Sequence, residues 1–140
     1  MILQSRFRLS VAVLFTILIT SALVALSEEQ SKQKWSAPAA EAQKKNPVAA
    51  TESALAAGRK IYSKTCVMCH GKTGDADGPA VIELNIHPAK LSDPNLATES
   101  DGSLFWKITT GKKPMPTFGK RFSETDRWNL VNYIRTLPKR

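Results

Sequence analysis

The sequence predicts an all-α fold for residues 51–140, a small domain whose first and last helices cross and whose loops are long. Three observations support this class. Apolar residues recur at helical spacing near both ends of the region, a third helix has clear end signals between them, and no useful stretch alternates as a strand does. From Gly71 to Ser100, a high content of glycine, proline and aspartate predicts a loop.

The first helix is expected to begin at Thr51 and to run into the two cysteines. Its buried stripe follows three- and four-residue spacings through Leu55, Gly58, Ile61 or Tyr62, and Thr65. Glycine inside a helix is less stable than alanine. Gly58 therefore indicates that another element approaches the helix backbone at this point.

The last helix is predicted to be that element. Ser123 and Asp126 fit a capping box at its start, and Pro138 stops it. Its apolar stripe includes Tyr133, which we expect to lie across Gly58 of the first helix. The two helices should therefore cross at the glycine.

A middle helix is expected from about Asp101 to Thr109, with Gly111 just past its end. A domain this small, with a loop of about 30 residues, has little core of its own. Such domains usually need a covalent or metal staple. Because the only two cysteines lie close together, we expect a bound prosthetic group rather than a disulfide framework.

Two segments precede this domain. Residues 1–27 contain Arg6, Arg8 and an uncharged apolar run over 9–26, which predicts a secretory signal peptide. Because the run is 18 residues long, a retained membrane anchor is the alternative. Residues 28–50 are rich in Ala, Lys, Gln, Glu and Pro and are expected to form a flexible linker. Either reading exports the domain to the periplasm, free or anchored to the inner membrane.

The stretch CVMCH, Cys66 to His70, holds both cysteines and one of the two histidines. A zinc site needs four ligands, and only His87 remains to complete a set of cysteines and histidines. Thiol–disulfide exchange would place Cys-x-x-Cys after a strand, whereas here it follows a helix. A further alternative is that the match to the motif is accidental and that Cys66 and Cys69 are plain buried thiols. A haem is favoured because Cys66, Cys69 and His70 share one helix face, where two thiols can bond to the vinyl groups and the imidazole can reach the iron.

The sixth ligand of such an iron has three candidates. Met68 lies between the cysteines, on the far side of the turn. Met115 lies in GKKPMPTFG, where Pro114 and Pro116 stiffen the backbone and forbid a helix, so that it does not follow the pattern of a core-filling methionine. His87, in NIHPAK, is the rival. We expect Met115 to be the ligand.

Three segments make residues 51–140 resemble the class I mono-haem cytochromes c of bacteria: GRKIYSKTCVMCHGKTGDADGP, DGSLFWKITTGKKPMPTFG and FSETDRWNLVNYIRTLP. The resemblance implies a small cytochrome c fold stapled by one haem c and its iron. It implies thioether bonds to Cys66 and Cys69, and His70 and Met115 as the axial ligands.

The resemblance also implies particular contacts around the haem. The carbonyl of Pro79 is expected to accept the N–H of His70 and to orient the ring. Gly58 is expected to contact Tyr133, and Trp106 to lie near the haem rim.

With both axial positions filled, no site remains for substrate or oxygen, so the sequence predicts a one-electron carrier and not an enzyme. The net charge of +8, near +6 without the two N-terminal arginines, favours acidic redox partners or membrane surfaces, and nucleic acid is not expected outside the cytoplasm. Lys112, Lys113, Lys120 and Arg121 are expected to steer such partners. Two alternatives stay open: an electron-relay subunit of a larger dehydrogenase or reductase complex, and a haem sensor or peroxidase if Met115 does not bind.

Overall fold

A computed structural model describes residues 35–138 of the chain. Within them, residues from Ser36 onward form one compact unit. The α-helices are α2 (Ala39–Ala42), α3 (Glu52–Ile61), α4 (Val67–His70), α5 (Ala80–Glu83), α6 (Asp101–Thr110) and α7 (Glu124–Thr136). A π-helical turn, Tyr62–Cys66, joins α3 to α4, and a 3₁₀ turn, Pro94–Thr98, precedes α6. No strand forms among the described residues, which confirms the all-α prediction.

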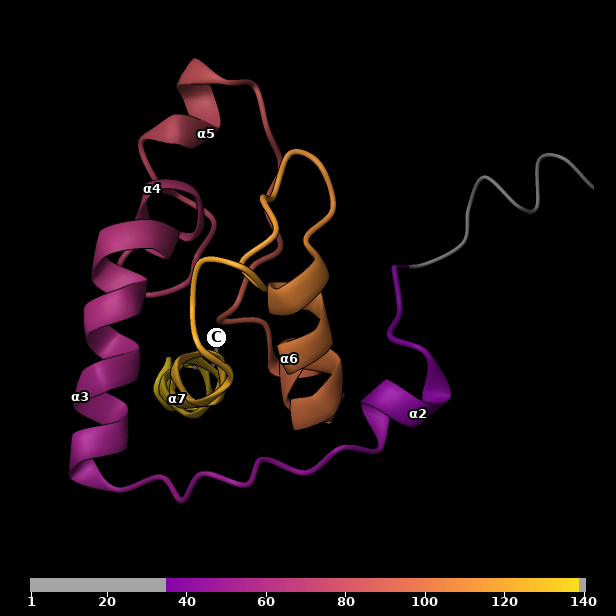
Figure 1. Cartoon of the computed structure of the whole chain (residues 1–140). Helices are drawn as coiled ribbons and strands as arrows, with labels where there is room; N and C mark the ends of the chain where they lie inside the picture. Colours follow the sequence, from indigo (N-terminus) through magenta and orange to yellow (C-terminus); the bar gives the residue numbers. More distant parts are fainter. Residues whose placement is uncertain (1–34, 139–140) are drawn as a thin grey trace, which may run out of the picture. The chain divides into compact units, whose positions relative to one another are not determined.

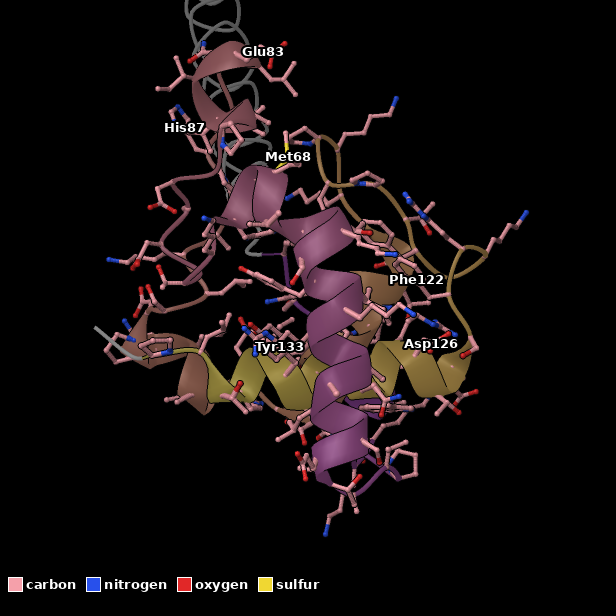
Figure 2. All side chains as sticks on the ribbon, turned by 90° about the vertical axis from the view of Figure 1, so that its left-hand side faces the viewer. Met68, Glu83, His87, Phe122, Asp126 and Tyr133 are labelled. Carbon is pink, nitrogen blue, oxygen red and sulfur yellow. The ribbon has the colours of Figure 1, made fainter. Side chains whose placement is uncertain are left out.

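The crossing of α3 and α7 organises the domain (Figure 1). A Cβ atom added to Gly58 would lie 2.1 Å from the carbonyl oxygen of Asn129 and 2.8 Å from Cβ of Tyr133. Next to this contact, the rings of Tyr62 and Tyr133 meet with centroids 5.3 Å apart. The predicted close approach at Gly58 is therefore confirmed, and Figure 2 shows α3 passing across α7.

The predicted helix ends agree with the structure. Ser123 and Asp126 form both hydrogen bonds of the capping box, and α7 ends at Thr136, two residues before Pro138. Gly111, with φ of 64°, follows the end of α6. From α6, the buried ring of Phe105 stacks on Trp128 of α7 with ring centroids 3.9 Å apart. This contact joins α6 to α7 and completes the core.

The stretch from Gly71 to Ser100 is more ordered than predicted. It contains the one-turn helix α5 and the 3₁₀ turn, and its residue Leu91 belongs to the buried core. Short helical turns of this length have no apolar periodicity, so the sequence pattern could not indicate them.

The structure also differs from the flexible linker expected over residues 28–50. Residues 28–34 lie outside the described part, but residues 36–50, here called the strap, pack against the domain. In the strap, α2 contacts α6, and the Ser100 hydroxyl donates a hydrogen bond to the carbonyl of Ala42 at 2.6 Å. Over these residues the linker prediction needs correction.

An asparagine pair fastens the strap to α7. The Asn46 side-chain amide donates to the carbonyl of Trp128 at 3.2 Å and to Oδ1 of Asn132 at 2.8 Å. The Asn132 amide in turn donates to the carbonyl of Val48 at 2.9 Å. These amide hydrogen bonds thus add to the apolar contact that Val48 of the strap makes with the core.

None of the helices in residues 35–138 has the length and hydropathy needed to cross a bilayer. The apolar run over 9–26, and with it the signal peptide or anchor expected over 1–27, lies outside the described residues.

Candidate haem site

The two cysteines and His70 lie at the end of one continuous helical path. It begins in α3, passes through the π-helical turn Tyr62–Cys66 and ends with α4, where Gly71 has φ of 78°. π-Helical turns inside helices are frequent at functional sites. The cysteines are half-buried and not joined in a disulfide. The path thus presents all three side chains within one turn and a half of helix, as their spacing predicts.

His70 has one ring nitrogen engaged and one available. Its Nδ1 lies 2.9 Å from the carbonyl oxygen of Ala89. Because a carbonyl only accepts, Nδ1 carries the hydrogen and Nε2 is left as the nitrogen that can bind a metal. Burial lowers the pKa of His70, while the Ala89 carbonyl raises it. Because burial is the larger effect, the pKa is lowered overall, which favours the neutral imidazole that binds iron.

The partner of His70 differs from the prediction. Pro79 was expected to accept its N–H, but the acceptor is the carbonyl of Ala89, and Pro79 stands at the N-cap position of α5. The acceptor comes from the segment after α5, ten residues further along the chain. A backbone carbonyl leaves no trace in the side-chain sequence, so only the tertiary structure identifies Ala89.

The environment of Cys66 argues against thiol–disulfide exchange. Burial raises the pKa of its thiol to about 12, with the charge of Cys69 acting in the same direction and nearby Arg121 opposing it. At neutral pH this thiol is therefore protonated. Exchange needs a thiolate, and catalytic Cys-x-x-Cys sites lower the pKa instead.

Met115 is held by a fixed backbone turn after α6. Lys112 and Met115 exchange two backbone hydrogen bonds of 3.1 and 2.9 Å. A Cβ on Gly111 would lie 2.4 Å from the carbonyl oxygen of Pro116, so the turn folds tightly back on the end of α6. Beyond the turn, the Phe118 amide donates to the carbonyl of Ile108 at 3.2 Å. The position of Met115 is therefore set by backbone contacts on both sides.

The candidate ligands differ in where they pack. Met115, Cys66 and Val67 are half-buried against the same hydrophobic core. Met68 is 47% exposed, and His87 is exposed beside α5 (Figure 2). The structure thus brings the methionine turn and the Cys-x-x-Cys-His helix to one core and leaves Met68 and His87 on the surface. Two thiols, an imidazole with a free Nε2 and a thioether form a donor set that fits a haem c.

Sequence reasoning did not assign a role to the hydroxyl of Tyr62. Tyr62 is fully buried, and its hydroxyl donates to the carbonyl of Gly71 at 2.7 Å. This bond fixes the residue that directly follows His70. The signal in the sequence was a tyrosine on the buried stripe, four residues before Cys66.

The family follows from a comparison with known proteins. Residues 53–134 match the family model described as cytochrome C oxidase, cbb3-type, subunit III. The chain belongs to the class I mono-haem c-type cytochromes. This cytochrome is similar to cytochrome c6 of Alaria esculenta, at 32% identity over 56% of this chain and 86% of the relative. It is also similar to cytochrome c6 of a Synechococcus strain, at 29% identity over 57% and 67%.

Among solved structures, this cytochrome resembles a chain of the reducing HAO-like protein complex of Kuenenia stuttgartiensis. The identity is 33% and the TM-score 0.59, over 66% of this chain and 47% of that chain. It therefore spans about half the length of the matched chain. As a member of its family, this cytochrome carries one covalent haem c, which supplies one-electron chemistry at its iron, and it is an electron carrier rather than an enzyme.

Proposed function

We propose that this cytochrome is an exported one-electron carrier in a respiratory chain, with thioether bonds at Cys66 and Cys69 and axial ligands from His70 and Met115. The observation that supports this ligand set best is the common packing of Met115 and Cys66 on one core. The free Nε2 of His70 supports it further. A thioether opposite an imidazole favours ferrous iron and raises the potential.

Filling both axial positions separates a carrier from a haem sensor or peroxidase. A sensor or peroxidase needs an open or exchangeable distal position. The backbone of Met115 is fixed on both sides by hydrogen bonds and by the tight turn at Gly111, so the thioether does not depend on a mobile loop. This arrangement favours the carrier.

Replacing the methionine tests the proposed function. Met115→Ala should keep its haem, open the distal site to carbon monoxide and lower the potential. Met115→His should remain six-coordinate, also at lower potential, because imidazole is the stronger donor to ferric iron. Met68→Leu is the matched control and should change neither property, since Met68 is a surface residue. A Met115→Ala protein with an unchanged spectrum would place the sixth ligand elsewhere, and His87 would be tested next.

The covalent attachment has its own test. Acid–acetone extraction of denatured protein should leave the haem on the polypeptide because Cys66 and Cys69 bind it. In Cys66→Ala with Cys69→Ala the haem should extract freely. Free extraction from the unaltered protein would contradict the thioether assignment without bearing on Met115.

The partner is proposed to be a redox protein with an acidic docking face. Lys112 and Lys113 precede Met115, Lys120 and Arg121 follow it, and all four side chains are exposed. The charge of Arg121 acts to lower the pKa of Cys66, which supports a position of this residue near the proposed haem attachment. Positive charge around the site of electron exit would speed association with an acidic surface.

A second candidate function is an electron-relay subunit of a larger complex. The likeness to a chain of the reducing HAO-like complex favours it, because that chain is about twice as long as the matched region. Size-exclusion chromatography of native extract, followed by its haem absorbance, distinguishes the two roles. A free carrier elutes near the mass of a single small domain, whereas a relay subunit elutes with its complex.

A further inference from the structure

We propose that Asp75 and Ser92 are positioning residues that hold the carbonyl of Ala89 against the ring of His70. This inference rests on the proposed role of His70 as the iron ligand. Neither Asp75 nor Ser92 belongs to the ligand set. Their role follows from the way the chain returns to His70 after α5.

Ala89 cannot hold its own carbonyl in place. Its methyl group and the side chain of Lys90 are exposed, and Pro88 is only half-buried. The nearest buried residues are Leu91, at 8% exposure, and Ser92, at 0%. Whatever fixes Leu91 and Ser92 therefore fixes the hydrogen-bond acceptor of His70.

Ser92 is fixed by the segment that follows the histidine. Its amide donates to the carbonyl of Gly74 at 3.0 Å, and its hydroxyl donates to Oδ1 of Asp75 at 2.6 Å. The other carboxylate oxygen of Asp75 accepts from the Thr73 hydroxyl, also at 2.6 Å. Nζ of Lys90 lies 3.6 Å from Asp75 Oδ1. Asp75 thus contacts the segment before α5, at Thr73, and the segment after it, at Lys90 and Ser92.

Together with two contacts of His70 itself, these bonds form a closed hydrogen-bond network. The backbone carbonyl of His70 accepts from the Ala76 amide at 3.0 Å, and its ring donates to Ala89 at 2.9 Å. The Asp75–Ser92 bond joins the two segments that make these contacts. Because Ser92 is fully buried, losing its hydroxyl removes one partner of a short charge-assisted bond and leaves the carboxylate less satisfied.

This hydrogen-bond network acts on the metal through the imidazole of His70. A hydrogen bond from Nδ1 to a carbonyl raises the basicity of the nitrogen that binds the metal and fixes the ring's orientation. A more basic imidazole favours ferric iron. Loosening the Asp75–Ser92 bond should therefore weaken the bond to Ala89 and shift the iron toward the ferrous state.

The test uses the full-length holoprotein with Ser92→Ala, and Asp75→Asn as a second variant. The first readout is hydrogen exchange of the His70 Nδ1 proton, followed by NMR of the ferrous protein. In Ser92→Ala, the state in which Nδ1 is bonded to the Ala89 carbonyl loses the support of one hydrogen bond. The exchange should therefore speed up about fivefold. The second readout is a redox titration, in which the ferrous-to-ferric ratio at a fixed solution potential should rise about two- to threefold, because the bond to Ala89 is weakened and not removed.

Asn132→Ala is the matched control, because it removes a polar contact between the strap and α7 that lies outside the hydrogen-bond network around His70. It should lower stability and leave both histidine readouts unchanged. Unchanged readouts in folded Ser92→Ala would overturn the positioning role. If Ser92→Ala does not fold, Asp75→Asn decides: its amide keeps one oxygen acceptor without the negative charge, so it should show the same changes at smaller size, and their absence would overturn the proposal.

The two proposals fail in different ways. If the unaltered protein shows no iron-bound imidazole N–H signal, the ligand role of His70 is wrong. If that signal is present and both variants leave it unchanged, only the role of Asp75 and Ser92 is wrong.

Discussion

Adding one methyl group at Gly58 should destabilise the protein, although the same change in an exposed helix stabilises it. The new Cβ would lie 2.1 Å from the carbonyl oxygen of Asn129 and 2.8 Å from Cβ of Tyr133. Both neighbours belong to α7 and lie at or next to its backbone, so neither can rotate away. The two helices must move apart by about 1 Å before the contact becomes tolerable.

The magnitude follows from two opposing terms. Overpacking a well-packed contact typically costs about 1–3 kcal/mol, and a clash with backbone belongs at the upper end. Alanine regains about 1 kcal/mol because glycine is a poor helix former. Gly58→Ala should therefore lower the free energy of unfolding by about 2 kcal/mol. For a domain of about 100 residues this corresponds to a fall in Tm of about 10 °C.

Thermal and guanidinium unfolding of the holoprotein, followed by circular dichroism, measures this change. The matched control is Ala56→Gly, at an exposed position of α3. It should lower stability by about 1 kcal/mol through helix propensity alone. If propensity governed both sites, the two substitutions would have opposite signs. A neutral or stabilising Gly58→Ala would refute the close approach of α3 and α7.

Three further predictions concern the strap, the basic cluster and the N-terminus. Asn132→Ala leaves partners in the strap unpaired and should lower the free energy of unfolding by about 2 kcal/mol, measured by guanidinium unfolding; no loss would mean that the strap is not held by this pair. Charge reversal at Lys112, Lys113 and Lys120 should slow electron transfer to the physiological partner, most strongly at low salt, and an unchanged salt dependence in stopped-flow traces would count against an acidic partner. If residues 1–27 are a cleaved signal, the intact mass of the native protein will show their loss, whereas a retained segment would indicate an anchored cytochrome.

The sequence by itself determined the helices and the chemistry of the attachment motif. Helical spacing marked the two long helices, Ser123 and Asp126 marked a cap, and an isolated glycine marked the crossing at Gly58. These features are local, because a helix period, a capping box and a missing side chain each act within a few residues. For the same reason, spacing alone assigns Cys66, Cys69 and His70 to one helix face.

Only the tertiary structure decided what surrounds the motif. The acceptor for His70 is the carbonyl of Ala89 and not that of Pro79, and the strap is packed rather than free. Both depend on backbone groups meeting across long loops, and every residue type carries the same carbonyl and amide. Side-chain patterns report burial and local geometry, whereas the path of a loop such as 71–100 is set by the sum of many weak contacts made only once the chain has folded.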